Sequence, residues 1–91
     1  FPLFQIGNEA GRRGGTAPAV FNAANEVAVA EFLIGDLSFR MIADVVGEVM
    51  TRAKTRSVTH LEEVLEADGE AREIARKLVQ RERSTARGLN G

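Results

Sequence analysis

The 91-residue sequence contains no cysteine, tryptophan or tyrosine, and it has only one histidine and two prolines. Without cysteine, the chain can form neither a disulfide nor a cysteine-ligated metal site, so nothing in it requires an oxidising compartment. No apolar run approaches the roughly 18 residues that a membrane-spanning helix needs. These absences argue against a disulfide-stapled scaffold, a cysteine zinc module and a membrane span.

Neither sign of charge is in excess. Twelve Lys and Arg against thirteen Asp and Glu give a net charge of −1, which is not the footprint of a nucleic-acid-binding domain. The distribution is uneven, because residues 1–69 hold six basic and ten acidic side chains, whereas residues 70–91 hold six basic and three acidic ones. The basic end leaves open an autonomous helical module that binds an acidic protein partner. Nucleic-acid binding through the same basic residues is the weaker alternative, since no aromatic residue lies among these charges to stack on bases.

Apolar residues recur at helical spacing, and no segment alternates as a strand does. We expect a short first helix that Gly11 and Gly14-Gly15 end, and a long helix from the N-cap Thr16 through Ile34 to Gly35. Ser38 is expected to cap a third helix whose apolar side includes the following residues: Phe39, Ile42, Ala43, Val45, Val46, Val49, Met50 and Ala53. The fold class predicted is all-α, a small four- to five-helix bundle around the central apolar helix Val20–Ile34.

The last third of the chain predicts two further helices. Thr59-His60-Leu61-Glu62 has the form of a capping box, in which Glu62 would accept a hydrogen bond from the Thr59 amide. Asp68 is a second candidate N-cap, ahead of an apolar stripe that includes Ala71, Ala75 and Val79. The pattern is lost at Ser84, so we expect a helical domain over residues 1–83 and a flexible tail over 84–91.

The segment Val20–Ile34 is apolar almost all the way round, yet Asn22, Asn25 and Glu26 share one arc of it. Its broad apolar half is expected to include Ala30 and Ile34. The three polar residues could be ligands for a substrate or a metal, or hydrogen-bond anchors for a loop, a helix or an adjoining domain. Two neutral amides and one carboxylate suit backbone clamping better than proton transfer, so we favour the structural anchor.

Other candidates for chemistry are weak. His60 and Glu63 form an i,i+3 pair, but a di-metal bundle needs a second such pair, so we interpret His60 as a surface residue near a helix start. The segment from Gly11 to Thr16 lies between helices and lacks both the P-loop ending and the dinucleotide-binding spacing. We therefore predict no catalytic, cofactor-binding or metal-binding residue in this chain.

The central helix carries a family resemblance. Its sequence resembles the LNAANE segment near the end of 1-deoxy-D-xylulose 5-phosphate reductoisomerases, and the similarity extends over nearly the whole chain to about Arg83. The matching stretch reads Val20-Phe21-Asn22-Ala23-Ala24-Asn25-Glu26-Val27-Ala28-Val29-Ala30-Glu31-Phe32-Leu33. The resemblance implies the C-terminal helical domain alone, and the absence of an initiator Met ahead of Phe1 fits a piece of a longer protein. An exposed Phe1 or Phe4 would mark a severed domain boundary.

The resemblance also implies a reaction, cofactors, partners and a location for the whole enzyme. Enzymes of this family convert 1-deoxy-D-xylulose 5-phosphate to 2-C-methyl-D-erythritol 4-phosphate in non-mevalonate isoprenoid synthesis, with NADPH and a divalent metal (Mg or Mn). The implied partners are the remaining domains of the same enzyme, as a homodimer, with no nucleic acid and no membrane. The implied location is the cytoplasm of a bacterium, or a plastid in a eukaryote. None of the family's catalytic residues has a matching position here, so the domain alone is expected to be inactive and to act as a scaffold.

Overall fold

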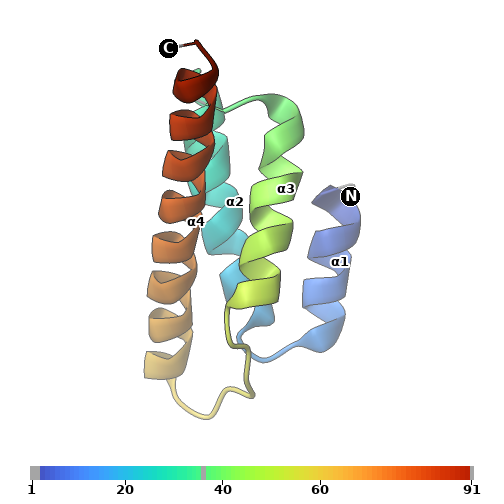
Figure 1. Cartoon of the computed structure of the whole chain (residues 1–91). Coiled ribbons are helices and arrows are strands. Elements are labelled where there is room, and N and C mark those ends of the chain that lie inside the picture. The colour runs from blue at the N-terminus through green and yellow to red at the C-terminus, as the bar shows by residue number, and fades with distance from the viewer. Residues whose placement is uncertain (1–2, 36, 91) are drawn as a thin grey trace.

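The computed structural model describes residues 3–35 and 37–90, with side chains as far as Arg83, and this part of the chain contains four helices and no strand. Consecutive helices run in opposite directions, and α2 lies against each of the other three (Figure 1). The all-α bundle predicted from the sequence is therefore confirmed. Its helices are α1 (Leu3–Arg13), α2 (Ala17–Leu33), α3 (Phe39–Arg52) and α4 (Leu61–Asn90).

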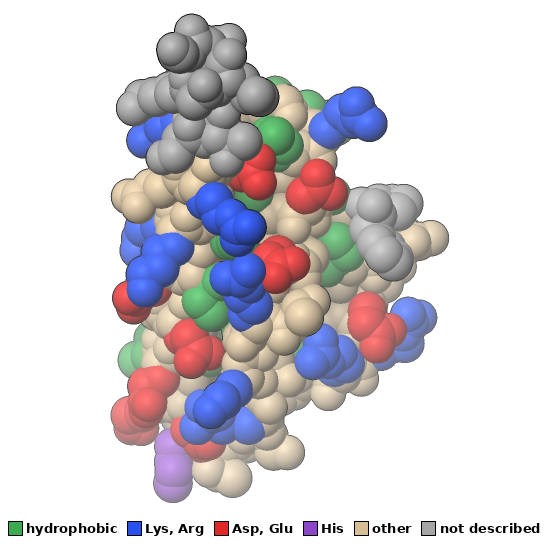
Figure 2. Space-filling view, in the orientation of Figure 1, with side chains coloured by type: hydrophobic (Ala, Val, Ile, Leu, Met, Phe, Trp, Pro, Cys, Tyr) green, Lys and Arg blue, Asp and Glu red, His purple; other side chains and the backbone are tan. Residues whose placement is uncertain are grey.

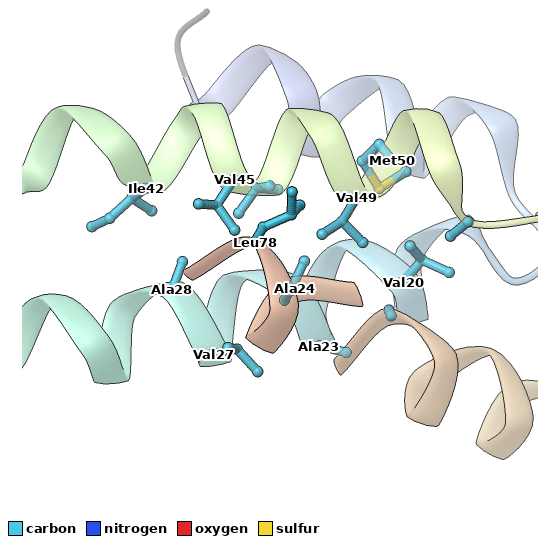
Figure 3. Packing of buried hydrophobic residues seen from close by; sticks show 14 of the residues in the cluster. Val20, Ala23, Ala24, Val27, Ala28, Ile42, Val45, Val49, Met50 and Leu78 are labelled. Carbon is cyan, nitrogen blue, oxygen red and sulfur yellow. The ribbon is translucent and has the colours of Figure 1, made fainter. Parts of the chain in front are cut away.

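The core is built from small and β-branched side chains. Figure 3 shows Val45 and Val49 of α3 above Ala24 of α2, with Leu78 of α4 beside them. Alanines on facing helices let the backbones approach closely, and the valines fill the space that remains. The fully or almost fully buried alanines of α2 and α4 are Ala17, Ala23, Ala24, Ala28, Ala67, Ala71 and Ala75.

The central helix α2 is not buried all round. Three neighbouring helices leave one stripe of it open to solvent, which consists of Pro18, Asn22, Glu26, Ala30 and Leu33. The expectation that Ala30 and Ile34 belong to the buried half was wrong. Ala30 lies on the open stripe, and Ile34 follows the last turn of the helix and is 70% exposed.

The apolar side of the third helix matches its prediction at most positions. Ile42, Val45, Val46, Val49 and Met50 are buried, and Ala53 is buried just after the helix ends. Phe39 was expected on the same apolar side but is 74% exposed. It is the first residue of α3, and its ring meets that of Phe32 edge-to-face, with the ring centroids 5.6 Å apart.

None of the three residues predicted as N-caps makes the expected side-chain cap. Ser38 precedes α3 with an extended backbone, but its side chain makes no cap hydrogen bond. Thr16 precedes α2, but its backbone is helical and its hydroxyl makes no cap hydrogen bond. Asp68 lies inside α4, because its carboxylate accepts a hydrogen bond from the Arg72 guanidinium one turn later (2.7 Å) instead of turning to a free amide. The two helices expected in the last third of the chain are therefore one, and the bundle has four helices rather than five over the described residues.

The C-terminal boundary stays a prediction. The helical backbone of α4 continues to Asn90, past the expected domain end at residue 83. Side chains after Arg83 are not described, and Phe1, Pro2 and Gly91 lie outside the described residues, so the flexible tail at 84–91 and the exposure of Phe1 remain expectations. Phe4, by contrast, is 77% exposed.

The bundle has two ends, which we name by their connections. At the loop end, residues 14–16 join α1 to α2 and residues 53–60 join α3 to α4; at the turn end, a short connection joins α2 to α3 (Figure 1). The loop end is tied by Thr16, whose N–H donates to the Arg56 carbonyl (2.9 Å) and whose hydroxyl accepts from the Arg56 N–H (3.0 Å). Thr16 is completely buried, so it joins the two loops instead of capping its helix.

Candidate interdomain anchor

Two of the three anchor candidates form a bridge between α2 and α4. The Asn22 side-chain amide donates to Glu26 (Nδ2 to Oε2, 2.9 Å), and the Arg72 guanidinium donates to the other oxygen of Glu26 (3.1 Å). Arg72 also donates through Nε to Asp68 (2.7 Å). The bridge therefore runs from Asn22 through Glu26 and Arg72 to Asp68.

The charges in this bridge stabilise each other. The carboxylates of Asp68 and then Glu26 accept hydrogen bonds from Arg72, and this raises the pKa of the Arg72 guanidinium above its ordinary value. The Glu26 side chain is 55% exposed, and solvent-exposed pairs of this kind contribute up to about 1 kcal/mol. The bridge thus ties two helices of this chain together, and Asn22 and Glu26 already have partners within it.

Asn25 is placed differently. It lies one turn after Phe21 on α2, and the Phe21 ring packs against Gly7 of α1. The carbonyl oxygen of its side chain, Oδ1, is buried and accepts no hydrogen bond. Buried polar atoms are nearly always paired in folded proteins, so an unpaired acceptor requires an explanation. The structure therefore separates Asn25 from Asn22 and Glu26, although the sequence places all three on one arc.

The basic last helix has acidic partners on α2. Arg83 donates to Glu31 (2.7 Å), which makes a second bridge beside that of Arg72. Lys77 pairs with Glu73 one turn earlier on α4 (3.3 Å). Figure 2 shows basic and acidic side chains interleaved on this face. The basic end of the sequence therefore forms no surface of a single sign over the described side chains.

The start of α4 contains a residue that the sequence analysis missed. Glu63, not Glu62, closes the helix start: one carboxylate oxygen accepts from the Thr59 N–H (2.9 Å), the Thr59 hydroxyl (2.6 Å) and the His60 N–H (2.9 Å). The prediction was off by one residue because the helix begins at Leu61, which puts Glu63 at its third position. These hydrogen bonds, that of the Thr59 hydroxyl first, hold the pKa of Glu63 below its ordinary value of 4.5.

The turn at Gly14-Gly15, between α1 and α2, is closed by the chain itself. Gly14 and Gly15 have positive φ angles of 66° and 57°, and a Cβ at Gly15 would overlap the Arg56 carbonyl oxygen. That oxygen accepts the Thr16 N–H and would repel an anion. Over the described residues, no group of three His, Asp or Glu side chains is placed to hold a metal ion. No helix in that part of the chain is long and apolar enough to cross a membrane.

The fold and its polar contacts define a class of protein, a small all-α bundle domain whose charged side chains bridge one helix to another. The family follows from comparison with known proteins. Residues 1–74 match the model of the DXP reductoisomerase C-terminal domain, and the chain belongs to this family.

Individual relatives agree with this assignment. The chain is 46% identical over 80 residues to the 1-deoxy-D-xylulose 5-phosphate reductoisomerase of Desulforamulus reducens, covering 88% of this chain and 21% of that protein. It is 50% identical over 80 residues to the enzyme of the same name from Cupriavidus pinatubonensis, covering 88% and 20%. With the Thermodesulfovibrio yellowstonii enzyme it shares 49% identity over 77 residues, covering 85% and 20%. The chain thus spans about a fifth of the length of these relatives.

Proposed function

We propose that these residues form the C-terminal helical domain of an NADPH-dependent reductoisomerase. The full-length enzyme would convert 1-deoxy-D-xylulose 5-phosphate to 2-C-methyl-D-erythritol 4-phosphate in non-mevalonate isoprenoid biosynthesis, with Mg²⁺ or Mn²⁺ as its metal. The observation that carries the proposal is the match to the C-terminal-domain family over residues 1–74, together with relatives that are named for this substrate.

The role proposed for the domain is structural. The described residues offer no three-ligand metal cluster, and the Gly14-Gly15 turn is backed by a carbonyl oxygen that would repel a phosphate. We therefore derive no catalytic step through either group. The 91 residues alone would be inactive, and their function would be to support the catalytic part of the enzyme. Asn25, with its unpaired buried oxygen, is the member of the predicted trio best suited to anchor that part.

The wider setting is proposed on the same basis. The direct partners of the domain would be the remaining domains of its own polypeptide, and the full-length enzyme would be a homodimer. Its location would be the bacterial cytoplasm, or the plastid if the source is a eukaryote. Neither a nucleic acid nor a membrane enters the proposal.

Truncation of the full-length enzyme tests the scaffold role. Removal of residues 1–91 should abolish NADPH oxidation that depends on 1-deoxy-D-xylulose 5-phosphate, whereas removal of residues 84–91 alone, the matched control, should leave it nearly unchanged. The 91-residue chain should show no turnover. Turnover by this chain alone, or full activity of an enzyme without residues 1–83, would contradict the proposal.

An autonomous protein-binding module is the second candidate. A shallow groove between α2 and α4 is lined by three arginines of the last helix, Arg72, Arg76 and Arg83, and this observation favours an acidic partner. Glu26 and Glu31 line the same groove and pair with Arg72 and Arg83, which weakens that reading. Salt-dependent binding of an acidic protein that is lost in Arg76→Gln would support it.

A further inference from the structure

We propose that the turn end of α2 and α3, together with the first turn of α1, is the surface on which the upstream part of the same polypeptide docks. The inference rests on the proposed function, in which about four fifths of the enzyme precedes this domain. It deepens that function by naming the surface and its occupant.

The helices leave this surface uncovered because α1 is too short. Gly7 of α1 faces Phe21 of α2, and the two helices run in opposite directions (Figure 1). Four residues of α1 precede Gly7, whereas twelve residues of α2 follow Phe21, so α2 continues about 12 Å beyond the start of α1. Over that length, described residues of α1 cover neither α2 nor the start of α3.

The uncovered region is apolar. Leu33 is 73% exposed, Ile34 is 70% exposed and Phe39 is 74% exposed, and all three lie at the α2–α3 connection. Single exposed apolar residues are common, but several large ones at one end of a small domain mark an interaction surface. Phe4 in the first turn of α1 is 77% exposed and lies toward the same end.

An unpaired polar group lies at the edge of this region. Asn25 follows Phe21 by four residues, and Leu3 precedes Gly7 by four, so Asn25 is level with the first turn of α1. Its buried Oδ1 is therefore close to the point where the chain enters the domain, and it still lacks a donor. A backbone N–H of the entering chain would satisfy it once the amide turns outward from its buried position, and an amide side chain recognises backbone in this way.

The position of α1 also identifies the occupant. In the proposed enzyme the upstream chain enters through the first turn of α1, so it is held beside the uncovered region at a high effective concentration. A second copy of the domain would have no such advantage. The loop end provides the contrast, because Val58, Leu61 and Leu65 are exposed there by 41%, 70% and 63%, but no chain enters at that end.

Thiol labelling of the full-length enzyme tests the surface. Leu33→Cys and Phe39→Cys report on the turn end, and Leu65→Cys is the matched control at the loop end, each in an enzyme whose other cysteines have been replaced. These 91 residues contribute no cysteine of their own. With a small maleimide, both turn-end thiols should react about tenfold or more slowly than the control, at a ratio independent of enzyme concentration. In denaturant all three should react equally.

Three results would overturn the inference. Equally fast labelling of all three thiols would mean that nothing covers the turn end. Equally slow labelling would mean that the upstream part does not choose between the two ends. Protection of Leu33→Cys that disappears on dilution would identify a second copy as the occupant. Labelling does not depend on turnover, so a failure of the proposed function would appear in the truncation assay and not here.

Discussion

The two ends of the bundle differ in how far contacts within this chain pair the polar groups and cover the apolar side chains. At the loop end, Thr16 and Arg56 exchange two hydrogen bonds across 40 residues of sequence, and Glu63 accepts three donors at the start of α4. At the turn end, Leu33 and Phe39 remain largely exposed, and midway along α2 the Asn25 oxygen lacks a donor. Both ends expose some apolar side chains, but the loop end has its backbone groups bound in place.

This difference indicates at which end the contacts of the domain are complete within this chain. Hydrogen bonds that join distant segments stabilise a fold from within, whereas unpaired acceptors and uncovered aromatic rings gain free energy only from something added. The loop end is therefore where this chain determines its own stability. The turn end is where, in the proposed enzyme, the rest of the polypeptide contributes.

The largest expected effect comes from breaking the loop end at Gly15. Gly15→Ala should lower the free energy of unfolding by about 3–5 kcal/mol, because the new Cβ overlaps the Arg56 carbonyl and the backbone has a positive φ. Gly14→Ala is the matched control, since its φ is also positive but its Cβ would meet open space, and it should cost about 1–2 kcal/mol. Denaturant unfolding measures both, and equal losses would mean that the contact with Arg56 contributes nothing.

Removal of the Thr16 hydroxyl sharpens the same point. Thr16→Val keeps the shape but leaves the Arg56 N–H without its acceptor, so the free energy of unfolding should fall by about 1–3 kcal/mol. Thr16→Ser keeps the oxygen and should retain most of the stability. If the valine variant were as stable as the serine variant, the two loops would not be joined by this hydrogen bond.

A substitution midway along α2 should act only in the full-length protein. Asn25→Ala removes an acceptor that has no partner in these 91 residues, so it should leave the stability of this chain unchanged or slightly higher. In the full-length enzyme the same change should lower the free energy of unfolding by about 1 kcal/mol. Its effect should appear mainly as a lower melting temperature and not as a higher substrate KM. A larger effect on KM than on melting temperature would contradict the anchor role.

The smallest effect should depend on pH. The folded-state pKa of Glu63 is lowered, so its carboxylate stabilises the fold above its ordinary pKa of 4.5, and this contribution is lost as the pH falls through the lowered value. Glu63→Gln should therefore be slightly less stable than the parent chain at pH 7, and the difference should shrink as the medium becomes more acidic than pH 4.5. Thermal melts across this range measure it. A difference that grew on acidification would reverse the assigned sign.

Local sequence patterns predicted most of the fold. Ile42, Val45 and Val49 are spaced for one face of a helix, and Gly35 ends α2 with a positive φ of 87°, as its type and position indicate. The start of α4 was missed by one residue, because Glu62 and Glu63 are both carboxylates and only the true first turn decides between them. Asp68 could not be recognised as a helix-interior residue, since its partner Arg72 suits either arrangement.

The contacts that hold the two ends could not be predicted from local patterns. Thr16 looks like an N-cap in sequence, and its pairing with Arg56 depends on how two distant loops meet. The three anchor candidates also differ in their hydrogen-bond partners, for the same reason. Glu26 pairs with Arg72 on α4, 46 residues later, and also accepts from Asn22, whereas the Asn25 oxygen has no partner. The position of neighbouring helices, not the arc on α2, determines which polar group is left unpaired.

Amide hydrogen exchange tests the central claim most directly, by comparing the 91-residue chain with the full-length enzyme at its two ends. The account predicts that amides of residues 29–41, at the turn end, exchange more slowly in the full-length enzyme, while those of residues 57–66, at the loop end, exchange at similar rates in both. Equal rates for residues 29–41 in both proteins, or slowing confined to residues 57–66, would contradict it.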